Sequence, residues 1–209
     1  LLDLQPGQVV ISQGVLTSIA ILVELLSAEG DGIIIPLPAY QPFIRIVNNL
    51  QRTMLGWPLL YDQDTHTFSL DWPLYEELCK RARILIFCSP HNPSGMVFGQ
   101  QDLIRLCEIA KQHNVVIISD EIHADLSFEP HITLLEPARQ VGCEAVVCMA
   151  PSKTFNIAGE HYSITLFNSS ELRKRFVTRL EQLFLSAPSL VATTLALASY
   201  ESGGKWLEE

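Results

Sequence analysis

The sequence predicts an α/β fold with three layers, in which helices cover both faces of a mostly parallel sheet. Short apolar runs rich in β-branched residues alternate with longer segments whose apolar residues recur three and four positions apart. The runs are almost continuously apolar, as expected of strands buried on both faces. A chain of 209 residues that is 48% hydrophobic and 18% charged is large enough to bury one substantial core. We therefore expect residues 1–209 to form one domain.

The elements follow from these patterns, from one end of the chain to the other. Apolar runs bounded by turn residues predict strands at residues 32–36, 84–89, 115–120, 144–150 and 163–167. Helical periodicity predicts helices at residues 15–26, 72–83, 101–113, 169–185 and 188–200. Asp71, Gly99 and Ser169 are suitable residues to begin three of them. The chain contains no internal repeat and no linker-like tract.

Composition narrows the class of partner. A formal net charge of −9 without a block of basic residues argues against nucleic acid or an anionic membrane surface as a partner. Five cysteines form no CxxC pair, which fits a reducing, cytoplasmic compartment. No apolar run approaches a membrane span, and the first residues lack the features of a secretory signal. We expect small-molecule or protein partners, and a chain that is part of something longer.

Polar clusters follow four of the predicted strands. They read PAYQPF, SPHNPSG, SDEIHADL and APSKTFN, in chain order. The carboxyl ends of parallel strands share one edge of a sheet, and ligands of such sheets bind at that edge. The four clusters therefore predict a single site.

Lys153 and Asp120 are the most informative residues of these clusters. A lysine amine near positive groups, or partly desolvated, becomes nucleophilic and can condense with an aldehyde; the alternative is a solvated surface lysine. Asp120 closes a strand and is suited to pair with a buried cationic ring nitrogen; the alternative is a helix or turn cap.

Three further residues suit the same kind of ligand. Asn92 can donate a hydrogen bond to a phenolate oxygen, although NP and SG are also ordinary turn dipeptides. Tyr40 can stack on an aromatic ring or simply pack as an amphipathic side chain. Gly14 precedes an apolar helix, where free backbone N–H groups can meet a phosphate, or it only caps that helix.

The motifs HNPSG, SDEIHADL and SKTFNIAG, in this order, resemble the large domain of fold-type I pyridoxal-phosphate (PLP) enzymes of the class I/II aminotransferase family. The resemblance runs from SQGV to the helix after ITLFN. It implies that Lys153 is the Schiff-base lysine, which also shuttles the substrate α-proton. It further implies that Asp120 pairs with the pyridine nitrogen, that Asn92 donates to the 3-oxygen and that Tyr40 stacks on the ring. The phosphate would be held by the backbone amides of Val15 and Leu16 and by the hydroxyl of Ser152.

Departures from the family pattern favour one branch. Aminotransferases of this family usually carry serine and arginine where this chain has Ala150 and His161, and tyrosine where it has His123. APSKTFNIAG and DEIHADL are instead similar to the cystathionine β-lyase and cystalysin-like C–S lyases. We therefore expect β-elimination from sulfur amino acids to pyruvate, ammonia and a thiol. His123 is either a cofactor-binding residue or a packing histidine, and Glu160 stands where the family pattern predicts an apolar residue.

Two other functions stay open at this point: a PLP-dependent aminotransferase, and a non-catalytic chain that binds cofactor or protein partners. The second arises because the resemblance implies an N-terminal segment and a C-terminal small domain that this stretch does not show. The resemblance also implies a homodimer with an amino-acid substrate. No residue is predicted as a metal ligand.

Overall fold

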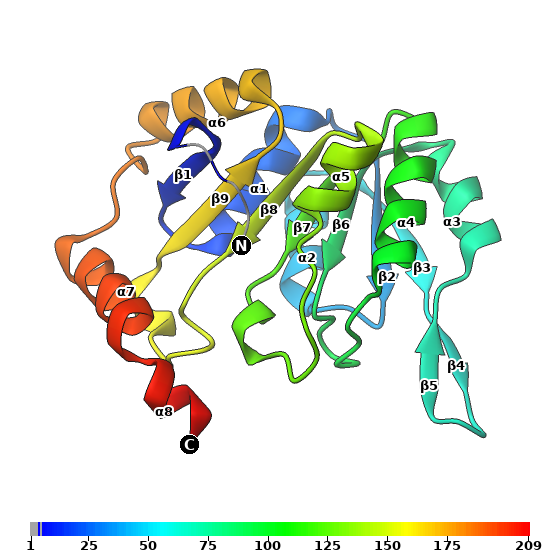
Figure 1. The fold of residues 1–209 in the computed structure, drawn as a ribbon. Helices are drawn as coiled ribbons and strands as arrows, with labels where there is room; N and C mark the ends of the chain where they lie inside the picture. The colour runs from blue at the N-terminus through cyan, green and yellow to red at the C-terminus, as the bar shows by residue number, and fades with distance from the viewer. Residues whose placement is uncertain (1–3, 5) are drawn as a thin grey trace.

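The protein folds around a seven-stranded sheet with helices on both faces (Figure 1). The computed structural model describes residue 4 and residues 6–209. The sheet has the strand order β1-β9-β8-β7-β6-β2-β3. In chain order its strands are β1 (Val9–Ser12), β2 (Gly32–Leu37), β3 (Thr53–Pro58), β6 (Ala82–Cys88), β7 (Val116–Asp120), β8 (Ala145–Met149) and β9 (Ser163–Phe167).

Strands β3, β2, β6, β7 and β8 run parallel to one another, whereas β9 is antiparallel to both of its neighbours, β8 and β1. The prediction of a mostly parallel sheet is thus confirmed. The carboxyl ends of β2, β6, β7 and β8 lie at one edge, which is where the four polar clusters begin.

Each face of the sheet has its own helices and its own core. One core contains Ile118 of β7 and is covered by α1 (Val15–Leu26), α2 (Gln41–Asn49) and α6 (Ser170–Gln182). The other contains Ile117 of the same strand and is covered by α3 (Trp72–Cys79), α4 (Gln100–Gln112) and α5 (Leu135–Val141). Successive side chains of a strand point to opposite faces, so neighbouring residues of β7 supply both cores.

The remaining elements lie at the two ends of the sheet. A hairpin of β4 (Leu60–Asp62) and β5 (Thr67–Ser69) extends beyond the sheet, and α7 (Leu190–Ser202) and α8 (Gly204–Glu208) lie at the opposite end (Figure 1). The C-terminal helices contact the loop after β8, because the ring of Phe155 packs edge-on against that of Tyr200 at 5.8 Å. Among residues 6–209 there are also three short 3-10 helices: Pro6–Gln8, Ala124–Leu126 and Ala158–Glu160.

All five predicted strands are present, each within two residues of its predicted ends. The predicted helix at 72–83 is wrong at its end, because α3 stops at Cys79 and Arg83 belongs to β6. In β6, Ala82 and Ile84 are buried while Arg83 between them is exposed, which is strand alternation rather than helical periodicity. The structure also contains elements that were not predicted: β1, β3, β4, β5, α2, α5 and α8.

All five cysteines are free and buried. No described helix is both long and apolar enough to cross a membrane. Within the described residues, no group of three or more His, Cys, Asp and Glu side chains is arranged to hold a metal ion.

Candidate functional site

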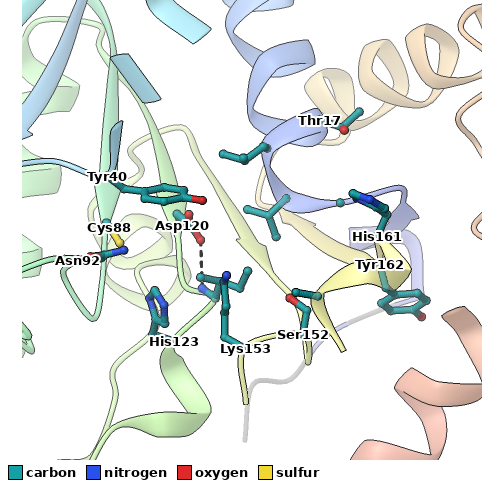
Figure 2. A pocket seen from close by; sticks show the side chains of 15 residues that line it. Thr17, Tyr40, Cys88, Asn92, Asp120, His123, Ser152, Lys153, His161 and Tyr162 are labelled. Atoms are coloured by element: carbon teal, nitrogen blue, oxygen red, sulfur yellow. Dashed lines mark hydrogen bonds between the residues drawn. The ribbon is translucent and has the colours of Figure 1, made fainter. Parts of the chain in front are cut away.

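A cavity of about 400 Å³ lies at the carboxyl edge of the parallel strands. Figure 2 shows its lining, which comes from strand ends, from the loops that follow them and from the start of α1. All the residues predicted for the site line this one cavity, namely Val15, Leu16, Tyr40, Asn92, Asp120, His123, Ser152 and Lys153. Residues of all four clusters thus meet in one cavity, while the site itself and the individual roles stay predictions.

Asp120 and Lys153 come from neighbouring parallel strands. Asp120 is the last residue of β7 and is only 4% exposed. Lys153 lies in the turn after β8, is exposed, and its side chain extends into the cavity (Figure 2). The two groups are close enough for the lysine charge to act on the acid.

Burial raises the pKa of Asp120 to about 7. The backbone N–H of Ile122, which donates to Oδ1 at 3.1 Å, opposes this rise, the charge of Glu121 adds to it, and Lys153 lowers the pKa again. The protein therefore offsets only part of the cost of burying a negatively charged carboxylate at this position. A cationic group placed in the cavity next to Asp120 would be stabilised, and the carboxylate with it.

Tyr40, Asn92 and His123 lie on the same side of the cavity as Asp120 (Figure 2). Tyr40 precedes α2, and its ring packs edge-on against Phe43 at 5.5 Å, which limits its movement. Burial, and then the charge of Lys153, lower the pKa of His123. A neutral imidazole is therefore favoured there.

The loop that carries Asn92 is held by its own hydrogen bonds. The N–H of His91 donates to the carbonyl of Met96 at 2.8 Å, and the N–H of Gly95 donates back to the carbonyl of His91 at 2.7 Å. The imidazole of His91, which is 3% exposed, bonds the Ser94 hydroxyl at 2.7 Å. The amide of Asn92 is thus presented from a fixed turn.

The N-terminus of α1 forms the opposite wall. Gly14 has φ +94°, a conformation that favours glycine, and no side chain caps the helix. The first N–H groups of a helix have no partner within it, so the amides of Val15, Leu16 and Thr17 are available to a ligand. The first turn carries no acidic residue. This wall therefore suits an anion.

A buried hydroxyl cluster fixes the direction of α1. The hydroxyl of Ser18 lies 2.7 Å from that of Ser12 in β1, 3.3 Å from that of Ser163, and 3.3 Å from that of Thr165 in β9. All four side chains are fully buried. The helix start is thereby attached to both strands beneath it.

The cavity also contains residues that sequence reasoning missed. Thr17, Cys88, Ile122, Ala158 and Tyr162 line it, as does His161, which had been noted only as a departure from the family pattern. Cys88 could have been found, because it pairs directly with Asp120 across β6 and β7. Ile122 lies in the SDEIHADL cluster, two residues after Asp120. The remaining residues depend on how α1 and residues 158–162 meet in space, which no local pattern encodes.

Eight polar side chains of the lining make no hydrogen bond or ion pair with any described residue: Thr17, Tyr40, Asn92, His123, Ser152, Lys153, His161 and Tyr162. Buried or half-buried polar groups normally find partners within a protein. A concave lining with several convergent, unpaired polar groups is typical of a ligand site.

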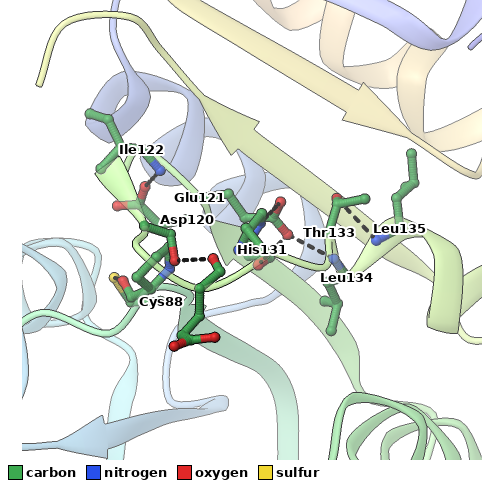
Figure 3. A network of polar contacts seen from close by, with 12 residues as sticks. Cys88, Asp120, Glu121, Ile122, His131, Thr133, Leu134 and Leu135 are labelled. Carbon is green, nitrogen blue, oxygen red and sulfur yellow. Dashed lines mark hydrogen bonds and ion pairs between the residues drawn. The ribbon is translucent and has the colours of Figure 1, made fainter. Parts of the chain in front are cut away.

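A second polar network anchors the segment that follows Asp120. Glu121 is 2% exposed, and its carboxyl group accepts from the Ser119 hydroxyl at 3.1 Å and from the Leu134 N–H at 2.8 Å, and bonds Nε2 of His131 at 2.9 Å (Figure 3). The N–H of Glu121 also donates to the carbonyl of Cys148 at 2.8 Å. These bonds fix the end of β7, and with it the position of Asp120.

Replacing Glu121 with alanine is expected to destabilise the fold by about 3 kcal/mol, because the Leu134 N–H, the Ser119 hydroxyl and His131 lose their acceptor in a buried position. Urea unfolding at neutral pH measures this change. Glu136→Ala is the matched control, since Glu136 is exposed at the cavity that His131 also lines, and it should change stability by less than about 0.5 kcal/mol. Equal effects of the two substitutions would contradict this role of Glu121.

Comparison with known proteins identifies relatives of this chain. The chain is 33% identical over 208 residues to the cystathionine beta-lyase PatB of Bacillus subtilis, and the matched region covers 98% of the chain and 53% of that protein. It superimposes on cystalysin of Treponema denticola, a structure that contains pyridoxal 5'-phosphate, with TM-score 0.92 and 30% identity over 99% of the chain and 53% of cystalysin. A PLP-bound C-S lyase of Staphylococcus hominis gives TM-score 0.91 and 26% identity, over 99% and 52%. The chain thus spans about half the length of these relatives.

The family model for aminotransferase class I and II matches residues 1–209, the whole of the chain. This match agrees with the parallel sheet, with the cavity at its carboxyl edge and with the lysine and aspartate that face each other there. The chain therefore belongs to the class I and II aminotransferase family.

Proposed function

We propose that the cavity binds pyridoxal 5'-phosphate, with Lys153 and Asp120 at opposite ends of the cofactor ring. One observation carries this proposal: an exposed, unpaired lysine amine and a buried, poorly compensated carboxyl group meet in one cavity that is closed by the N-terminus of an uncapped helix. Each of the three features suits a different part of the cofactor: the aldehyde, the ring nitrogen and the phosphate.

The residues present fit the cofactor. The cavity volume of about 400 Å³ lies within the range of about 300–1,000 Å³ that is usual for small-molecule sites. Backbone amides of Val15 and Leu16, together with the hydroxyl of Ser152, would hold the phosphate. Asn92 would donate to the 3-oxygen, and Tyr40 would cover the ring. His123 would contact it as a neutral imidazole, consistent with its lowered pKa.

The chain's own groups then have distinct tasks in the reaction. When bound, PLP supplies an electron-withdrawing ring that stabilises negative charge at the substrate α-carbon. Asp120 keeps a proton on the ring nitrogen, because a buried carboxylate beside a cation is better stabilised than one alone. Lys153 Nζ removes the proton from the substrate α-carbon and delivers a proton to the departing group. The sheet edge and α1 hold these groups in fixed relative positions.

For the reaction of the whole protein we propose C–S β-elimination, in which a sulfur amino acid yields pyruvate, ammonia and a thiol. Support comes from the motifs APSKTFNIAG and DEIHADL and from a relative that is named as a cystathionine beta-lyase. The aminotransferase alternative keeps support from the family match and from the 24% identical aspartate aminotransferase of Geobacillus stearothermophilus. A homodimer and a cytoplasmic location stay predictions.

One experiment separates these possibilities. The chain, and the longer protein that contains it, are incubated with PLP and then with L-cystathionine, with and without a keto acid. Pyruvate and free thiol in the absence of the keto acid are the expected result. Turnover that requires the keto acid would favour the aminotransferase, and a bound cofactor without any turnover would favour a binding function.

A further inference from the structure

Helix α7 contacts two loops that bound the cavity. One loop follows β8 and carries Lys153, and the other follows β7 and carries His123. Tyr200, near the end of α7, reaches both loops. Its ring packs edge-on against that of Phe155, with 5.8 Å between the ring centroids, and its hydroxyl donates to Oδ2 of Asp125 at 3.3 Å. Tyr200 therefore connects the two loops without lining the cavity itself.

Phe155 is coupled to Lys153 through a hydrogen-bonded turn. The N–H of Phe155 donates to the carbonyl of Pro151 at 2.9 Å, and the N–H of Ile157 donates to the carbonyl of Ser152 at 3.0 Å. The Lys153 amine makes no hydrogen bond or ion pair with any described residue. The position of the amine is therefore set by this turn, and the turn is held from outside by the contacts of Phe155.

Gly203 allows the end of α7 to approach Phe155 closely. A Cβ atom on Gly203 would contact Cε1 of Phe155, and would lie 2.8 Å from Cδ1 of that ring and 2.5 Å from the carbonyl oxygen of Ser199. Carbon atoms in favourable contact are about 3.5–4.0 Å apart, so a larger residue would displace the ring. The ring of Trp206 in α8 lies 6.1 Å from that of Phe155. Phe155 thus has partners in both C-terminal helices.

Asp125 connects Tyr200 to the segment that follows Asp120. It lies in the 3-10 helix Ala124–Leu126, whose first N–H donates to the carbonyl of Glu121 at 3.0 Å. Burial, and then the charge of Asp125, raise the pKa of Tyr200, so that its hydroxyl keeps its proton and acts as the donor. The second contact of Tyr200 is therefore attached to the end of β7.

We propose that Tyr200 is a positioning residue, which bridges the two loops and thereby fixes the Lys153 amine relative to Asp120. This inference rests on the proposed function. Asp120 ends its strand, whereas Lys153 lies four residues beyond the end of β8, so the sheet alone does not fix their separation. Reacting groups that are held in the correct geometry combine more readily than groups that are free to move.

The test compares PLP with pyridoxine 5'-phosphate, which has an alcohol in place of the aldehyde. The Lys153 amine condenses with the aldehyde of PLP and releases one water molecule, whereas it cannot condense with the alcohol. Dissociation constants of both ligands are measured by equilibrium dialysis for the unaltered chain, Tyr200→Ala, Tyr200→Phe and Val191→Ala. The ratio of the pyridoxine phosphate constant to the PLP constant isolates the contribution of the amine. Val191 is the control, because it is 58% exposed on the same helix.

Tyr200→Ala is expected to lower this ratio by about 10-fold, because it removes both the aromatic contact and the hydrogen bond. Tyr200→Phe keeps the ring and should lower it by only about 3-fold. Val191→Ala should leave it within about 2-fold of the unaltered value. A general loss of structure would weaken both ligands alike, so an unchanged ratio in Tyr200→Ala would overturn the positioning role.

Hydrogen exchange of the cofactor-free chain tests the bridge without any ligand. In Tyr200→Ala the hydrogen-bonded amides of residues 124, 155 and 157 should exchange about 10-fold faster, while those of the central strands stay protected. Faster exchange throughout the sheet, or none in the two loops, would overturn the proposal. Failure of the unaltered chain to bind PLP would instead overturn the proposed function, and the exchange result would still decide whether the bridge exists.

Discussion

Replacing Lys153 with alanine is expected to remove the shifted visible absorption that PLP acquires on binding and to lower turnover by at least about 1,000-fold. The amine is both the attachment point for the cofactor aldehyde and the base for the substrate α-proton in the proposed mechanism. No other lysine lines the cavity, although the chain has five. Absorption spectra after dialysis against cofactor-free buffer measure the first effect, and release of pyruvate measures the second.

Lys174→Ala provides the matched control for this substitution. Lys174 lies on α6, is exposed and does not line the cavity. Neither substitution should change the free energy of unfolding of the cofactor-free chain by more than about 0.5 kcal/mol, because both side chains are exposed. A retained visible band in Lys153→Ala, or its loss in Lys174→Ala, would show that the cofactor is attached elsewhere.

Replacing Asp120 with asparagine is expected to stabilise the cofactor-free chain at neutral and higher pH while impairing function. Folded Asp120 keeps its proton up to about pH 7, whereas an unfolded aspartate loses it near pH 3.8. The folded chain therefore binds more protons over this window, and its stability falls as the pH rises. One pH unit corresponds to about 1.4 kcal/mol, so the cost above pH 7 is on the order of 4 kcal/mol.

Asparagine has no proton to lose and can still accept the Ile122 N–H at Oδ1. The stabilisation should thus be near zero at about pH 4 and rise to its full size above pH 7. Urea unfolding of Asp120→Asn across this range measures it, with Asp64→Asn in the exposed turn of the β4–β5 hairpin as control. With cofactor and substrate present, Asp120→Asn should be slower by roughly 100-fold or more. A stability difference that does not vary with pH would contradict the assignment of a raised pKa to this carboxyl group.

The proposed role of Asp120 and the structural cost of its carboxyl group have a common physical origin. A site that must receive a cation holds a carboxyl group in a place where the empty protein cannot stabilise its charge. Lys153 offsets only part of that cost. Stability is therefore recovered when a cationic ligand binds, which links folding of the chain to the presence of its partner.

Much of the site followed from the sequence because the relevant patterns are local. Buried parallel strands appear as short apolar runs, and the residue that ends each run lies at the ligand edge whatever the helices do. Asp120 and Lys153 could therefore be assigned to one site from their positions after two such runs. The helix start at Gly14 was likewise readable, because an apolar periodic segment follows it directly.

Other features depend on contacts between distant segments. The antiparallel direction of β9, its pairing with β1 and the meeting of His161 with Gly14 all result from how the last strand returns beside the first. Strand β1 is only four residues long and was too short to show a period. Glu121 and His131 are ten positions apart, in a segment whose only regular structure is the short 3-10 helix Ala124–Leu126, and no spacing rule predicts their contact.

The most direct test of the account is a crystal structure of the chain grown with PLP. We expect continuous density between Nζ of Lys153 and the cofactor, a carboxylate oxygen of Asp120 within about 3 Å of the ring nitrogen, and the phosphate against the amides of Val15 and Leu16. Cofactor bound in another cavity, or in this one with its ring nitrogen turned away from Asp120, would contradict the account.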